Sequence, residues 1–101
     1  MYRASTPTFT FELPFALSTV QECLITFAQD EDTVVEKSLE DCDYDGSTIR
    51  LTLTQEDTLE FEEGKASVQL NVMTKTGQRL PSVTQTFKVL ENLHDEVIEV
   101  E

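Results

Sequence analysis

The sequence predicts an all-β protein in which two sheets pack face to face. Most segments alternate apolar and polar residues with a period of two, which is typical of half-buried strands. Turn signals recur about every 8–12 residues, and one segment near residues 55–60 has the features of a short helix. With 101 residues, 39% of them hydrophobic, the chain can form a single domain over residues 1–101. We therefore expect an immunoglobulin-like β-sandwich of about six to seven strands, although Trp and widely spaced cysteines, two marks of antibody domains, are missing.

The first strand is predicted between two prolines. Phe9, Phe11 and Leu13 alternate with polar residues from Pro7 to Pro14, which indicates a half-buried strand at the edge or end of a sheet. The following FALSTV is a connection or a single helical turn.

The next two strands are predicted on either side of a QDED turn. The run ECLITFAQ is apolar on both faces, so we expect a central strand with Ile25 and Phe27 on one side. The run TVVEKSLE predicts a weaker strand with Val35 and Leu39 on one face.

An acidic hairpin is predicted next. In STIRLTLT, Ile49, Leu51 and Leu53 alternate with polar residues, and the preceding DCDYDG is expected to turn at Asp45-Gly46.

The helix is predicted from a capping pattern in TQEDTLEFEEG. Thr54 precedes Asp57 by three residues, as in a capping box, and Gly64 ends the segment. We expect one to two turns that carry the chain from one sheet to the other.

Two longer strands complete the prediction. In KASVQLNVMT, every second residue from Ala66 to Val72 is expected to face inward, and Gly77 supplies the positive φ of a tight turn. In RLPSVTQTFKVL, Phe87 and Val89 share one face with Val83, and Pro81 places this strand at an edge or a bulge.

An acidic tail over residues 91–101 follows the last predicted strand and has no turn signal. We expect it to be mobile or to add a strand to a neighbouring molecule.

The charge balance limits the classes of partner. Seven Lys and Arg face twenty Asp and Glu, so the net charge is −13 at pH 7. Such a surface repels phosphate and serves solubility; the alternative is an acidic inhibitor that occupies a basic groove of another protein. No apolar run approaches the roughly 20 residues that cross a bilayer, and the N-terminus is no secretory signal. We expect no nucleic-acid or membrane partner.

The sequence offers no residues that could converge on a reaction. His94 is the single histidine and lies in the tail, which is a poor place for a general base. Three scattered glycines form no phosphate-binding loop. Cys23 and Cys42 are predicted to be free thiols, a disulfide being the alternative, because Cys23 lies in an apolar run and carboxylates surround Cys42. We predict that the protein is not an enzyme and has no cofactor.

The acidic loop is also a candidate metal site. Asp41, Asp43, Asp45 and Gly46 have the D-x-D-x-D-G spacing with which an EF-hand calcium loop begins. That loop needs a bidentate Glu where this chain has Thr52, and it needs helices where strands are predicted. We therefore predict an acidic hairpin, with weak calcium binding, about millimolar, by the three aspartates as the alternative.

The order of several segments resembles a known family. The segments are TPTFTFELPF, LITFAQD, IRLTLTQEDTLEF, ASVQLNVMTKTGQ and FKVLENL, and together they span residues 5–93. They resemble small proteins encoded in prophage structural regions of Gram-positive bacteria, which are similar to the N-terminal domain of phage baseplate upper proteins. The resemblance implies a β-sandwich without enzyme activity, cofactor or catalytic residues. With no receptor-binding domain after residue 101, the chain is expected to be an accessory or adaptor.

The resemblance implies a structural interaction module of a phage or prophage tail or baseplate. The expected partners are other tail or baseplate subunits or copies of the chain in a homo-oligomer, in the virion or in the host bacterial cytoplasm before assembly. The alternative is a soluble ligand-binding module that binds calcium or, through the exposed rings of Tyr2 and Tyr44, glycans.

Overall fold

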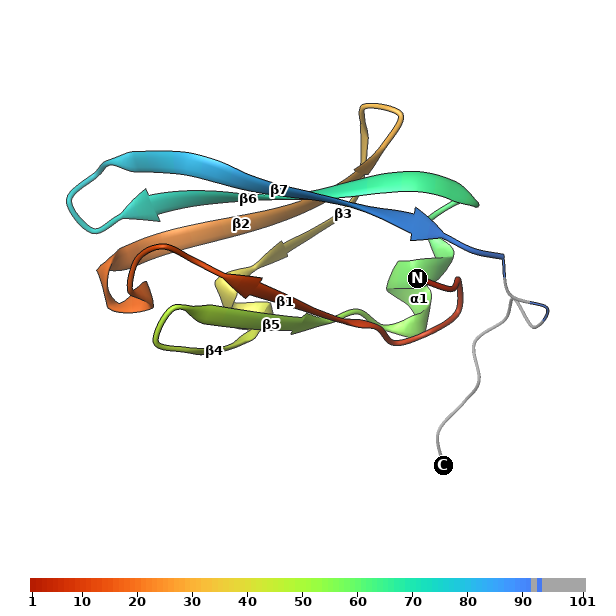
Figure 1. Ribbon diagram of the computed structural model, residues 1–101, viewed down its shortest axis with the longest axis horizontal. Coiled ribbons are helices and arrows are strands. Elements are labelled where there is room, and N and C mark those ends of the chain that lie inside the picture. The colour runs from red at the N-terminus through yellow and green to blue at the C-terminus, as the bar shows by residue number, and fades with distance from the viewer. Residues whose placement is uncertain (92, 94–101) are drawn as a thin grey trace.

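The computed structural model describes residues 1–91 and residue 93, and it shows two antiparallel sheets around one apolar core (Figure 1). The smaller sheet has the strand order β1 (Thr8–Glu12), β5 (Thr48–Thr52) and β4 (Asp43–Asp45). The larger sheet has the order β3 (Asp32–Ser38), β2 (Val20–Gln29), β6 (Gly64–Thr74) and β7 (Arg79–Val89). The short helices are η1 (Leu17–Thr19), η2 (Leu39–Asp41) and α1 (Gln55–Leu59). The predicted all-β sandwich with one short α-helix is confirmed.

The predicted acidic tail lies largely outside the described residues. The uncertain positions are 92 and 94–101, so His94 and the predictions made for the tail fall there.

The strand order differs from that of an immunoglobulin domain. In immunoglobulin constant domains the second strand shares a sheet with the first, fourth and fifth. Here β2 pairs with β3 and β6 in the larger sheet. The β2–β3 connection explains this order, because a two-residue turn keeps consecutive strands in one sheet. The likeness to immunoglobulin domains therefore holds for the two-sheet architecture and not for the strand order.

The inner faces of both sheets carry the predicted apolar positions. Every second side chain of β6 is buried, and in the β2–β6 register Ile25 lies opposite Leu70 and Phe27 opposite Val68. The smaller sheet contributes apolar residues that the sequence also predicted. These are Phe11, Leu13, Ile49, Leu51 and Leu53.

Four phenylalanine rings from different segments meet between the sheets. The ring of Phe9 lies 5.3 Å from that of Phe27 and 5.1 Å from that of Phe87, centroid to centroid. Phe61, which follows α1, lies 5.9 Å from both Phe27 and Phe87. These edge-to-face and tilted contacts join β1, β2 and β7 at the centre of the core.

Two of the three hairpins, β2–β3 and β4–β5, have turns of two residues. Asp30 and Glu31 link the paired residues at the β2–β3 turn with φ of 50° and 72°, which is the pattern of a type I′ turn. The β4–β5 turn consists of Gly46, with φ of 61°, and Ser47, because Asp45 already pairs with Thr48. The predicted hairpin is confirmed, and its turn lies one residue later than Asp45-Gly46.

The helix α1 begins at the predicted capping box. The Thr54 hydroxyl accepts a hydrogen bond from the Asp57 N–H (3.1 Å), and the Asp57 carboxylate accepts one from the Thr54 N–H (3.0 Å). These reciprocal bonds satisfy backbone donors that a helix start leaves without partners.

The N-terminal segment packs on both β7 and α1. Tyr2 forms a parallel bridge with Leu90, just after β7. Arg3 reaches the end of α1, where its guanidinium donates to the carbonyls of Leu59 (3.2 Å) and Phe61 (2.7 Å). This segment therefore closes the end of the sandwich near α1 (Figure 1).

Candidate functional site

The three aspartates of the acidic loop lie in different local structures. Asp41 ends η2, and its carboxylate accepts hydrogen bonds from the Ser38 N–H (2.9 Å) and hydroxyl (3.3 Å). Asp43 and Asp45 lie on β4, opposite Arg50 and Thr48. Since they are two residues apart on a strand, both point to the outer face of the smaller sheet.

The capping role of Asp41 separates it from the other two carboxylates. In the part of the chain that the structure describes, no three His, Cys, Asp or Glu side chains are close enough to hold a metal ion. Asp41, Asp43 and Asp45 are close in the sequence, but the structure does not gather their carboxylates around one point as metal ligands. Calcium binding by these residues stays a prediction.

The hydrogen bonds between Ser38 and Asp41 form a capping box, and β3 ends at Ser38, earlier than predicted. Ser38 and Asp41 have the spacing of a capping box, and η2 starts between them at Leu39. Leu39, expected in the strand with Val35, instead packs partly buried against the core from η2.

The two tyrosines expected to be exposed are exposed. The exposed fraction is 55% for Tyr2 and 54% for Tyr44. Tyr2 lies beside the end of β7, whereas Tyr44 lies on β4 near the hairpin turn, so they belong to opposite ends of the sandwich (Figure 1). They do not form one aromatic platform for a sugar.

Both cysteines are free thiols, as predicted. Burial raises the pKa of Cys23 to about 11. Burial, followed by the nearby Cys23, Asp41 and Asp43, raises the pKa of Cys42 to about 11 as well. Neither thiol is therefore a reactive thiolate at neutral pH.

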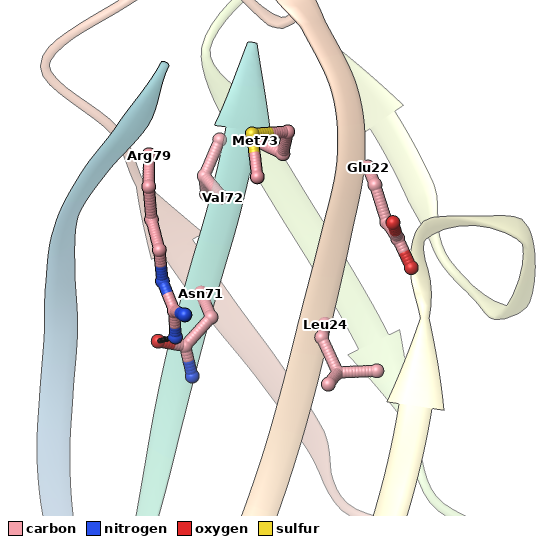
Figure 2. A pocket seen from close by; sticks show the side chains of 6 residues that line it. All are labelled: Glu22, Leu24, Asn71, Val72, Met73 and Arg79. Atoms are coloured by element: carbon pink, nitrogen blue, oxygen red, sulfur yellow. Dashed lines mark hydrogen bonds between the residues drawn. The ribbon is translucent and has the colours of Figure 1, made fainter. Parts of the chain in front are cut away.

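A hollow of about 170 Å³ lies on the outer face of the larger sheet. Figure 2 shows side chains from β2, β6 and β7 around it, with Leu24 and Met73 as apolar walls. The guanidinium of Arg79 lies at one side and donates to the Asn71 side-chain oxygen (2.9 Å). Sequence reasoning missed this hollow, because it depends on the pairing of three strands that are far apart in sequence.

The outer face around this hollow has an unusual charge for so acidic a chain. The outward positions of the larger sheet carry Lys65, Lys88 and Arg79 but, among the described residues, just two acids, Glu22 and Glu36. Most acidic residues lie instead in turns, helices and connections. The outer face of the larger sheet thus differs in charge from the rest of the described surface.

These observations define the class of the protein as an all-β, two-sheet sandwich whose exposed features are flat sheet faces and open strand edges. No protein-family model matches the chain, and the comparisons with curated proteins and with solved structures find no match. None of the helices in the described part of the chain has the length and apolar character needed to cross a membrane.

Proposed function

We propose that the protein is a non-enzymatic interaction module that assembles with other proteins of a phage or prophage tail or baseplate, or with copies of itself. The observation that carries the proposal is the outer face of the larger sheet. It carries two acids, Glu22 and Glu36, and is indented by the hollow between Leu24 and Met73, although the chain has a net charge of −13. The cores of protein interfaces are enriched in Met and Arg, and the hollow is lined by Met73 and Arg79.

The open strand edges support the same proposal. Both sheets end in edge strands, and β7 is the longest of the four with 11 residues. Along β7 no charged residue occurs from Leu80 to Phe87. Long uncharged edges are usually protected in proteins that act alone, because they pair readily with other chains.

The placement in a phage particle rests on the sequence resemblance described above. The segment LTLTQEDTLEF, which carries it most, forms the end of β5, the capping box of Thr54 and Asp57, and α1. The virion, or the bacterial cytoplasm before assembly, is the proposed location.

Co-precipitation with purified tail and baseplate proteins tests the proposal. We expect the chain to capture at least one of them, and we expect Met73→Glu, which puts a charge in the hollow, to reduce the capture. Glu40→Gln, an exposed position on η2 outside this face, is the matched control. Failure to bind any tail protein or another copy of the chain would count against the proposal.

A second candidate function is weak calcium or glycan binding. The observation that favours it is the exposed ring of Tyr44 on β4, the strand whose opposite face carries the carboxylates of Asp43 and Asp45. Calcium binding is tested by calorimetric titration of the parent and of Asp43→Asn with calcium. Glycan binding is tested on a glycan array with the parent and Tyr44→Ala. Equal heats and an unchanged array would remove this candidate.

A further inference from the structure

Two lysines lie side by side on the outer face of the larger sheet. Lys65 of β6 stands directly opposite Lys88 of β7 in the antiparallel register, and both side chains are exposed. No carboxylate among the described residues forms an ion pair with either. Like charges at opposite positions of two strands are destabilising. In a chain with twenty acids and seven cations, these two cations thus lie together without a carboxylate partner among the described residues.

The rest of this face is close to neutral. Arg79 lies farther along β7, opposite Met73. The described outward residues of β6 and β7 between these cations are uncharged. They are Ser67, Gln69, Asn71, Thr84 and Thr86.

The outer face of the smaller sheet has the opposite charge. Its outward positions carry Glu12, Asp43 and Asp45 against a single cation, Arg50. The other outward positions are threonines, namely Thr8, Thr10, Thr48 and Thr52. Thr8 and Thr52 share a hydrogen bond of 2.8 Å, which keeps their hydroxyls close to the sheet.

We propose that two copies of the chain associate head to tail, with the larger-sheet face of one copy on the smaller-sheet face of the next; this inference rests on the proposed function. Lys65 and Lys88 lie at the α1 end of the larger sheet, whereas Asp43 and Asp45 lie toward the opposite end of the smaller sheet, so the neighbour is turned end for end and its aspartates face the lysines. The serine and threonine side chains of the two faces allow the sheets to pack at about 10 Å. Contact between two larger-sheet faces would instead set each lysine pair against a face with three cations and two acids. Such a head-to-tail interface repeats into a column or a ring.

The net charge of the chain is compatible with this contact. The acids at the turns, such as Asp30 and Glu31, lie around the rim of the sandwich and repel those of the next copy. At physiological ionic strength the Debye length is about 8 Å, so rim charges are screened more strongly than ion pairs in direct contact. We expect association to be strongest at intermediate salt and weaker at both low and high salt.

Charge reversal of either face tests the proposal by sedimentation analysis. Lys65→Glu with Lys88→Glu makes both faces negative, and Asp43→Lys with Asp45→Lys makes both positive. Each double variant alone is expected to lose self-association by about tenfold or more. An equimolar mixture of the two is expected to regain it, because each variant then finds a complementary face on the other. Lys75→Glu, in the β6–β7 turn and outside both faces, is the matched control and is expected to associate like the parent.

The mixing step separates a specific interface from a general effect of charge or of misfolding. Circular dichroism and thermal unfolding identify any variant that fails to fold, and recovery on mixing requires both variants to be folded. A parent that stays monomeric at every salt concentration, or a mixture that does not recover, would overturn the proposed self-association. A monomeric parent that still captures a tail protein would leave the proposed function standing, so the two failures are distinguishable.

Discussion

Lys37 Nζ lies 3.1 Å from Asp57 Oδ2 and ties the edge strand β3 to the first turn of α1. The Asp57 carboxylate also accepts the Thr54 N–H, so one side chain caps a helix and joins it to a sheet. Partial burial by itself raises the pKa of Asp57, but the hydrogen bonds from Thr54 and Lys37 outweigh it and hold the pKa below its ordinary value of 3.8. The ionised form of Asp57 therefore stabilises the fold.

Replacement of this carboxylate should lower stability. We expect Asp57→Ala to reduce the free energy of unfolding by about 1 kcal/mol at pH 7, the usual cost of a lost cap with a partly exposed ion pair. Because the pKa is depressed in the folded state, the difference between parent and variant should shrink as the pH falls below 3.8. Urea unfolding at several pH values measures it. Glu56→Ala, an exposed acid in the same helical turn, should change little.

The β2–β3 turn offers a stabilising substitution. Glu31 has φ of 72°, a region in which a side chain is unfavourable and glycine is not. We expect Glu31→Gly to raise the free energy of unfolding by about 0.5–1 kcal/mol, since the relief of strain exceeds the entropy that glycine adds to the unfolded chain. Glu36→Gly, in the extended part of β3, should have the opposite sign. Equal effects at both positions would contradict the assignment of the turn.

The buried hydroxyl of Thr58 is expected to contribute substantially to the free energy of unfolding. Its Oγ1 lies 3.0 Å from the Ser5 carbonyl oxygen and accepts the Ser5 N–H, which attaches the N-terminal segment to α1. Thr58→Val keeps the shape but leaves these backbone groups without a partner, which costs about 1–3 kcal/mol. Thr10→Val, on the exposed face of β1, is the control and should stay within about 0.5 kcal/mol of the parent. Thermal unfolding compares the two variants.

The two thiols should make the protein sensitive to alkali. An unfolded thiol loses its proton near pH 9.0, while in the folded protein Cys23 and Cys42 keep theirs to about pH 11. The unfolded state is therefore favoured progressively as the pH rises through this window, and stability falls. The Cys23→Ala, Cys42→Ala double variant should show a shallower fall in urea midpoint between pH 9 and 11. Parallel curves for parent and variant would show that the thiols do not contribute.

Several parts of the fold could be predicted because their causes are local. Alternation placed Ile49, Leu51 and Leu53 in the core, and the Thr54–Asp57 spacing located the helix start. The buried Phe61 could not be found in this way, because it lies in an acidic segment and is buried by rings from distant strands. The capping box of Ser38 and Asp41 was not predicted, and its three-residue spacing is the local signal that could have indicated it.

The candidate site depended far more on long-range pairing. The spacing of Asp41, Asp43 and Asp45 suggested a common site, yet the Ser38 cap directs Asp41 into a separate local role. The hollow beside Arg79, and the pairing of Lys65 with Lys88, require the register of β6 and β7.

Local patterns in the sequence are sufficient to predict many of the buried residues, the position of most strands and turns and the strongly acidic character of the chain, because alternation, capping and charge act over a few residues. The pairing of β2 with β6 and the set of charges that share a face are settled by the tertiary structure. Those features follow from strand pairing between residues far apart in the chain, whereas a local turn encodes only which consecutive strands form a hairpin.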